Sequence, residues 1–375
     1  MNENLRVGSL FGIPFYLNLS WFLVLGLVAW NDGTWLLSQF PQLGALAYGL
    51  GLVAALLLFA SVLAHELGHS LIARRQGIEV KSITLFIFGG LAMLGEESKT
   101  PGDAFRVAIA GPLVSFTLFG LFNAIGTFTG VSGPLAALVA LLAYVNLALG
   151  TFNLIPGLPL DGGNVLKAIV WKVTGKPYRG LAFASKVGLF FGWVGVFLGF
   201  ASLLGLFPYG SIWTLLVGWF LLQNAGRSAQ AASIQELLSG LTAADAVTPN
   251  SPVVSQMISL RELANNYIIG NPANWRKFLV KDEAGKLVGE ILVEDMKTVP
   301  TNDWWDVTVQ KLMRSPSDVQ TVPAHQPLLE VLDLLNQSQT SALAVVKQED
   351  GTLLGLLEKT SIIELLQKRA EAKVA

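Results

Sequence analysis

The segment LGLVAALLLFASVLAHELGHSLIA, residues 50–73, decides the fold of this chain. It is long enough for one helix to cross a bilayer, and Glu66 is its only charged side chain. His65 and His69 are four residues apart, so a helix places both on one face, where they can share a metal ion. Glu66 then lies beside that metal and can take a proton from a bound water. The alternative is a chance pattern whose polar side chains reach the membrane interface.

The composition divides the chain into two parts. Of its 375 residues, 52% are hydrophobic, which is too many for an ordinary soluble protein of this size. Residues 1–227 contain long uncharged runs, whereas residues 228–375 carry more than half of the charged side chains. We therefore expect a polytopic α-helical membrane domain followed by a soluble domain. The net charge of −1 does not indicate nucleic-acid binding, and the absence of cysteine excludes disulfides and thiolate chemistry.

The basic residues predict the orientation of this membrane domain. They precede the first apolar span, occupy the second and fourth connections, and resume at Arg227. The other three connections contain no lysine or arginine. By the positive-inside rule, we expect both termini to be cytoplasmic in a multi-pass integral protein of a bacterial-type cell membrane. About six transmembrane helices are predicted, at roughly 17–36, 46–73, 104–127, 134–158, 181–206 and 209–227.

A third metal ligand is needed, since a catalytic zinc site uses three protein ligands and one open position. Asp161 is the candidate, because Asp32 lies in a predicted outer turn that solvent should reach. The prolines and glycines between Asn153 and Gly163 prevent a regular helix, and unwound backbone at membrane depth must line a cavity or be buried. The alternative is an ordinary helix end at which Asp161 caps the following helix.

These motifs resemble the site-2 protease family of intramembrane zinc metalloproteases. The resemblance rests on His65-Glu-Leu-Gly-His69, on Asn153-Leu-Ile-Pro-Gly-Leu-Pro-Leu-Asp161-Gly162, and on Phe88-Gly89-Gly90 between them. It implies one Zn²⁺ per chain held by His65, His69 and Asp161, with Glu66 activating water. It also implies that Asn153 hydrogen-bonds the substrate carbonyl or the developing oxyanion. From the residues alone, Asn153 could equally be an amide that packs helices together.

The segment Val80-Lys-Ser-Ile-Thr-Leu-Phe-Ile-Phe-Gly-Gly90 predicts a small membrane-associated β element. Its β-branched and aromatic residues favour a strand, and the paired glycines favour a turn. A substrate helix must unwind before hydrolysis, and a free strand edge could hold it by β-augmentation. The residues expected to bind substrate are Phe86, Ile87, Phe88, Gly89 and Gly90. The alternative is a hairpin with only a structural role.

The segment Ala110-Gly-Pro-Leu-Val-Ser115 also resembles a family motif, in which relatives often carry asparagine where Ser115 stands. We interpret it as small-residue helix packing.

The soluble part repeats itself. After a polar linker at 228–240, two α/β units are expected at 241–300 and 301–375, each with a helix and then strands around a glycine turn. This duplication resembles a tandem pair of cystathionine-β-synthase (CBS) domains. The resemblance implies a homodimer through these domains, and apolar positions at helical spacing between Leu328 and Leu335 could contribute to the contact.

The same resemblance raises the question of an adenine nucleotide between the repeats. The pattern that binds ribose in such domains is a serine or threonine three residues before an aspartate. The first repeat keeps only the acid, Asp295, with Leu292 before it, and the second has Glu358 and Ser361 in the wrong order. Nucleotide binding is therefore a weak expectation that rests on Asp295.

The leading functional hypothesis is a zinc endopeptidase that cleaves a transmembrane segment of a membrane-protein substrate near the cytoplasmic side, in regulated intramembrane proteolysis. A CBS-gated transporter or channel could use the same ionisable residues as an ion pathway. It would not need Glu66 as a base, and the spans show no internal repeat. A third possibility is an inactive relative that binds membrane proteins without cutting them.

Overall fold

The computed structural model describes residues 4–87, 89–208, 210–248, 251–269, 271, 275–315, 319–338, 340 and 342–374. They form two compact units, Met1–Ser233 and Ile234–Ala375.

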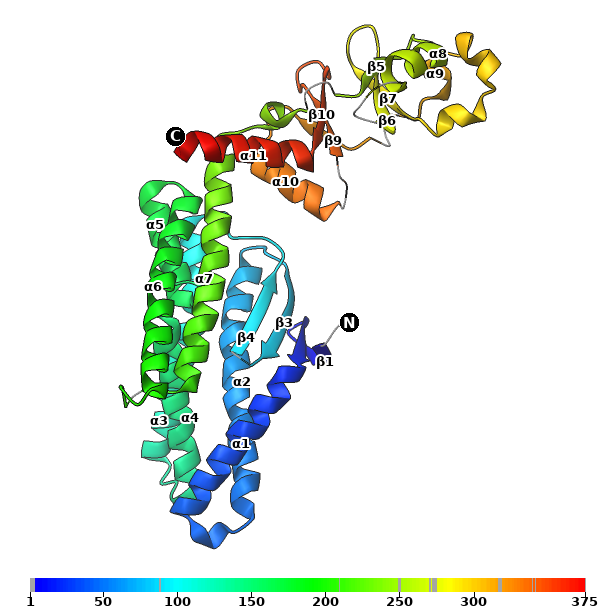
Figure 1. Cartoon of the computed structure of the whole chain (residues 1–375). Helices are drawn as coiled ribbons and strands as arrows, with labels where there is room; N and C mark the ends of the chain where they lie inside the picture. The colour runs from blue at the N-terminus through cyan, green and yellow to red at the C-terminus, as the bar shows by residue number, and fades with distance from the viewer. Residues whose placement is uncertain are drawn as a thin grey trace. The chain divides into compact units, whose positions relative to one another are not determined.

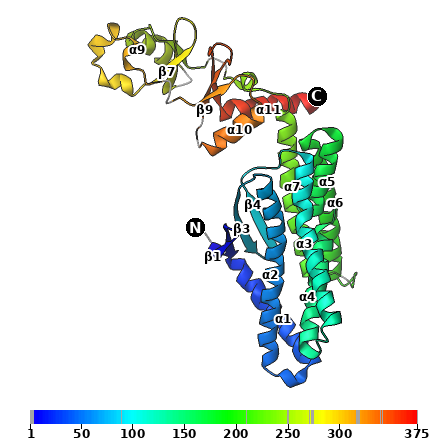
Figure 2. The ribbon, with the colours of Figure 1, turned by 180° about the vertical axis from the view of Figure 1, so that it is seen from behind.

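The first unit is a bundle of long helices with a small sheet (Figure 1). Its helices are α1 (Leu19–Gln39), α2 (Leu46–Arg75), α3 (Pro101–Phe128), α4 (Gly133–Asn153), α5 (Asp161–Thr174), α6 (Pro177–Leu203) and α7 (Ile212–Leu238), with a short 3₁₀ turn at Pro41–Leu43. Helix α3 packs against α2 and α4, which Figure 2 shows from behind. The apolar segment with the two histidines is α2, as predicted.

Four of the helices in the described part of the chain, α2, α3, α4 and α6, are long and apolar enough to cross a bilayer. The predicted spans 17–36 and 209–227 correspond to α1 and α7, which do not reach that hydropathy, so the number of spans stays a prediction. The interpretation of Asp32 was wrong. It lies inside α1 with 8% of its surface exposed, because α1 continues to Gln39 and packs along α2 instead of ending in an outer turn.

The β element is a four-stranded sheet whose order along the sheet is β1-β2-β3-β4. The strands are β1 (Asn4–Leu10), β2 (Ile13–Asn18), β3 (Val80–Phe86) and β4 (Gly89–Leu94). The buried side chains Ile13, Val80 and Ile83 pack with Ala73 of α2, which fixes the sheet against the helix that carries the histidines. Because β1 pairs only with β2 and β4 only with β3, β1 and β4 are the two edge strands of this sheet.

The second unit contains two three-stranded sheets of the same topology. In each sheet the first strand is parallel to the second, and the second is antiparallel to the third. The first sheet contains β5 (Val253–Ser255), β6 (Lys277–Lys281) and β7 (Leu287–Leu292); the second contains β8 (Thr321–Pro323), β9 (Ala342–Val346) and β10 (Leu353–Glu358). The helices are α8 (Leu260–Leu263), α9 (Val309–Leu312), α10 (Leu328–Gln337) and α11 (Lys359–Val374), with a π turn at Ala264–Ile268 and 3₁₀ turns at Ala243–Ala246, Asp295–Thr298 and Thr301–Trp305. The expected duplication of an α/β unit is confirmed.

Two details of the predicted division differ from the structure. The segment 228–240, predicted as a polar linker, is helical over most of its length, since α7 continues to Leu238, and Ala232 is buried in the first unit. The segments that begin the two repeats also pack in each other's cores. Leu241 and Ala243 pack in the core around Leu328, whereas Val309 packs in the core around Phe278. The divisions at 241–300 and 301–375 describe the duplication in sequence. In the structure, however, the first residues of each repeat pack in the hydrophobic core of the other repeat.

Candidate active site

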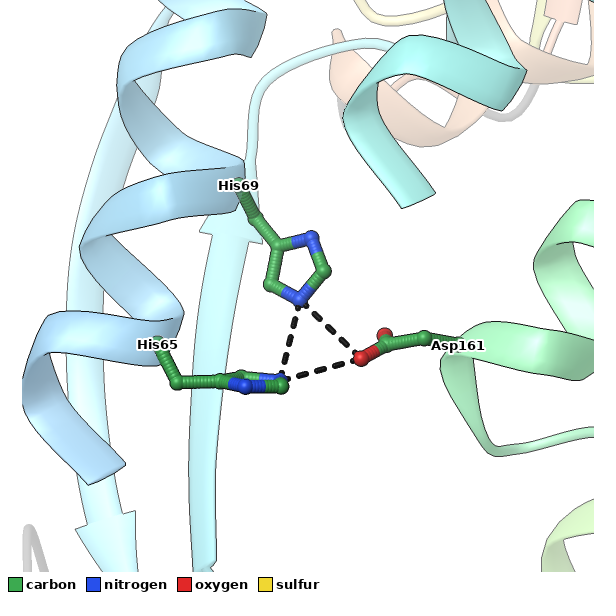
Figure 3. A group of neighbouring side chains, drawn as sticks. All are labelled: His65, His69 and Asp161. Carbon is green, nitrogen blue, oxygen red and sulfur yellow. Dashed lines mark hydrogen bonds and ion pairs between the residues drawn. The ribbon is translucent and has the colours of Figure 1, made fainter. Parts of the chain in front are cut away.

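Helix α2 brings His65 and His69 to the same face, one turn apart. Their side chains are buried, with 3% and 8% of the residue surface exposed, and their Nε2 atoms are 3.3 Å apart. The carboxylate oxygen Oδ2 of Asp161 lies 3.0 Å from Nε2 of His65 and 3.2 Å from Nε2 of His69 (Figure 3). The ligand atoms of the three predicted residues therefore converge, although His65 and Asp161 are 96 residues apart in the chain.

Asp161 reaches this point because the chain is unwound before it. Helix α4 ends at Asn153 and α5 begins at Asp161, so the segment between them is irregular, as the prolines and glycines predicted. The buried Leu158 anchors the segment, since its N–H donates to the carbonyl oxygen of Ala184 in α6 at 3.2 Å. Asp161 thus starts the first turn of α5 at a fixed place opposite α2.

The remaining ring nitrogens have partners on α3. Nδ1 of His69 donates to the carbonyl oxygen of Val107 at 2.7 Å, and Nδ1 of His65 lies 2.9 Å from Oγ of Ser115. A carbonyl only accepts, so neutral His69 carries its lone pair on Nε2, which faces the Asp161 carboxylate. Two acceptors so close repel each other unless a proton or a metal ion lies between them. The arrangement of donors and acceptors therefore fits a bound cation.

The spacing of the three atoms also fits zinc. A tetrahedral site with bonds of about 2.0 Å has ligand atoms about 3.3 Å apart. The three observed separations are 3.0, 3.2 and 3.3 Å. Gly111 of α3 leaves the necessary space, because a Cβ atom there would lie 2.2 Å from Nε2 of His69 and 2.6 Å from Nε2 of His65. The residues present therefore fit the zinc ion that the sequence motifs imply.

Glu66 lies between this site and the edge strand. Its side chain passes the backbone of Gly90, where an added Cβ would come within 2.4 Å of Cγ of Glu66. Ala92 of β4 lines the same cavity as this carboxylate. Glu66, both histidines, Asp161 and Asn153 line one cavity of about 530 Å³, which also includes residues of β4 and α5.

Asn153 faces this cavity from the last turn of α4. Its Nδ2 donates to the carbonyl oxygen of Leu149 at 3.0 Å, which uses one of the two N–H groups of the amide. The side chain is therefore oriented by its own helix.

The structure differs from the prediction that residues 86–90 form a free strand edge. Phe86 ends β3, which has neighbours on both sides, and the N–H of Ile87 donates to Oγ of Ser20. Neither residue offers a free edge. Gly89 begins β4, and of the five predicted residues Gly90 lines the cavity, while Phe88 lies outside the described residues. In this hairpin the free edge belongs to β4. The paired glycines begin β4, whereas the prediction placed them in a turn at the end of the strand that starts at Val80.

Gly111 and Ser115 are the residues at the site that sequence reasoning missed. The motif 110–115 was interpreted as helix packing, because nothing in the sequence of α3 shows which helix it faces. The available signal was their spacing of four residues together with a hydroxyl in an apolar run.

Asp295 of the second unit already has partners. Its Oδ1 accepts from Nη2 of Arg314 at 2.7 Å, and its Oδ2 accepts from Nε of Arg314 at 3.1 Å and from the N–H of Leu292. The Arg314 guanidinium holds the pKa of this carboxyl below its usual range, with a smaller lowering from the Leu292 amide and a partial offset from burial. A ribose hydroxyl would have to compete with this bidentate pair.

The fold and the site together define a membrane-embedded metallopeptidase, and comparison with known proteins identifies its family. A model described as Peptidase family M50 matches residues 53–132 and 129–195, and a CBS-domain model matches residues 309–368. A relative from Synechocystis sp. that is named as a zinc metalloprotease is 56% identical, over 99% of this chain and 97% of its own. One from Mycobacterium tuberculosis, also named as a zinc metalloprotease, is 32% identical over 98% of this chain and 93% of its own.

The chain therefore belongs to peptidase family M50, the site-2 protease family of intramembrane zinc metalloproteases, and carries a C-terminal CBS pair. A solved structure named "Site-2 Protease from Methanocaldococcus jannaschii" is 28% identical, covers 60% of this chain and 95% of that chain, and has a TM-score of 0.43. Membership of the family makes this chain an integral membrane enzyme that acts on a membrane protein in a lipid bilayer.

Proposed function

We propose that the chain is an endopeptidase that hydrolyses a peptide bond within a transmembrane segment of its substrate, near the cytoplasmic side. One observation carries the proposal: the convergence of His65, His69 and Asp161 in a cavity that also contains Glu66 and the edge of β4. The positions of the basic residues support a cytoplasmic location for this end of α2 and for both termini.

His65, His69 and Asp161 would hold one zinc ion, the metal that the relatives' names imply. When bound, zinc polarises a carbonyl oxygen and makes a water acidic enough to act as a nucleophile near neutral pH. Glu66 is not one of the three converging ligands, so its carboxylate is available to accept the proton of that water and pass it to the leaving amine. The second N–H of Asn153 can donate to the substrate carbonyl oxygen as negative charge develops on it.

The edge of β4 would hold the substrate in an extended conformation. A peptide bond inside a helix is shielded by its neighbours, and pairing with an edge strand replaces the helical hydrogen bonds with new ones. Strand β4 runs beside Glu66, so a segment paired with it would pass the catalytic carboxylate. The predicted role of this element in substrate binding is therefore carried by β4.

The CBS pair would join two copies of the enzyme. Most of the apolar residues of α10 serve the unit's own core: Leu328, Val331 and Leu335 are fully buried, whereas Leu334 is 40% exposed. A dimer contact would therefore use this exposed position and surfaces outside α10. Nucleotide binding at Asp295 would require its pair with Arg314 to open.

The experiment compares wild type, Glu66→Gln and Asp161→Ala in membranes of cells that lack the native gene. Glu66→Gln should keep one zinc per purified chain and lose cleavage, because only the base is removed. Asp161→Ala should lose both zinc and cleavage. Uncut membrane proteins that co-purify with Glu66→Gln identify the substrate. Full cleavage activity in Glu66→Gln would contradict the assigned mechanism.

A further inference from the structure

Three residues on one face of α3 contact the histidines of the candidate zinc site. Val107, Gly111 and Ser115 are spaced four residues apart and so lie on the same face. Val107 accepts a hydrogen bond from His69, Ser115 contacts His65, and Gly111 faces the Nε2 atoms of both rings. Helix α3 therefore supports both histidines from the side opposite their own helix.

The two histidines are supported differently. The carbonyl of Val107 can only accept, so it alone fixes the protonated nitrogen of neutral His69. The hydroxyl of Ser115 can accept or donate. A zinc ion on Nε2 of His65 requires the proton on Nδ1, and Ser115 is then its acceptor. Partners of this kind fix the orientation and tautomer of a ligand histidine.

We propose that Ser115 is a positioning residue for the zinc site, whose hydroxyl holds the His65 ring in the orientation and tautomer that present Nε2 to the metal. The inference rests on the proposed zinc site at His65, His69 and Asp161. It assigns to Ser115 a chemical role in addition to helix packing.

The buried Ser185 provides a comparison. Its Oγ donates to the carbonyl oxygen of Leu181, four residues earlier in its own helix, at 2.7 Å. Such bonds satisfy a buried hydroxyl without any tertiary partner. Ser115 has no exposed surface, and its hydroxyl lies 2.9 Å from the ring of His65, which belongs to a different helix.

Ser115→Val and Ser115→Thr in the full-length protein provide a matched test, because the two side chains have nearly the same shape and only threonine keeps the hydroxyl. Zinc dissociation constants are measured by competition with a chromogenic chelator, without any cleavage assay. Ser115→Val should bind zinc about 10–100-fold more weakly than wild type, the usual cost of removing such a partner. Ser115→Thr should remain close to wild type. Ser185→Val is the control, since Ser185 is buried but bonds only to its own helix.

The outcomes separate this inference from the proposed function. Wild-type protein that binds no zinc contradicts the proposed function itself. Zinc binding by wild type that is matched by Ser115→Val overturns only the role of Ser115. Equal weakening in Ser115→Val and Ser115→Thr shows that volume at this position matters and the hydroxyl does not, which also overturns the inference. Equal melting temperatures of the two metal-free variants verify that stability does not explain a difference in affinity.

Discussion

Replacing Gly111 by alanine tests the zinc site with a single methyl group. This glycine lies on α3, outside the helix that carries the histidines and outside the segment that carries Asp161. It contributes no side chain to the chemistry. The substitution therefore changes only the space that the metal and the two rings share.

The expected magnitude follows from the distances. The added Cβ would lie 2.2 Å from Nε2 of His69 and 2.6 Å from Nε2 of His65, whereas ordinary contact begins at 3.4 Å. The methyl group would therefore overlap the ligand nitrogens of both rings. At least one ring must then move out of bonding range. Protein zinc sites bind with about 10–16 kcal/mol over four ligands, so losing one ligand removes about 2.5–4 kcal/mol, or roughly 10²–10³-fold in affinity.

The assay is zinc content and affinity of purified protein, with cleavage measured in parallel. Gly120→Ala is the control, because it lies on the same helix with nothing within 4 Å of an added Cβ. It should bind zinc like wild type. Normal zinc affinity in a folded Gly111→Ala protein would refute the assignment of the two rings that Gly111 contacts as zinc ligands.

Three further predictions concern the edge strand and the second unit. Ala92→Pro removes a backbone N–H of β4 in the cavity that contains Glu66 and stiffens the strand, so cleavage should fall sharply while zinc content is unchanged; undiminished cleavage would leave β4 with only a structural role. The lowered pKa of Asp295 means that its pair with Arg314 stabilises the fold above the unfolded carboxyl pKa of about 3.9 and loses this effect as pH falls through the lower folded value. Asp295→Asn should accordingly lower the melting temperature at pH 7, and the difference from wild type should vanish towards pH 2–3; a difference independent of pH would contradict the pairing. Light scattering in detergent should give a dimer for the whole chain and a monomer for residues 1–233; a dimeric truncation would place the contact in the membrane unit.

The sequence predicted those parts of the site that depend on local geometry. A helix places residues four apart, such as His65 and His69, on one face, and the cluster of prolines and glycines just before Asp161 disfavours a regular helix there. Apart from Glu66, Asp161 was then the carboxylate expected at the same membrane depth as the two histidines. These inferences needed no knowledge of how the helices pack.

The features that the sequence did not predict depend on tertiary contacts. The role of Ser115 follows from the pairing of α3 with α2, which no periodicity in α3 reveals. Asp32 was expected in solvent because its neighbours favour a turn, but packing of α1 on α2 overrides that local preference. The packing of each repeat's first residues in the core of the other repeat likewise requires contacts between segments far apart in the chain, here Ala243 with Leu328.

The most direct test of the zinc site is anomalous diffraction from crystals of the purified protein, collected on both sides of the zinc absorption edge. The proposed mechanism predicts one anomalous peak per chain, bonded to Nε2 of His65, Nε2 of His69 and Oδ2 of Asp161, with the Glu66 carboxylate beside it but not bonded to it. A peak coordinated by other residues, or none in protein that cleaves its substrate, would contradict it.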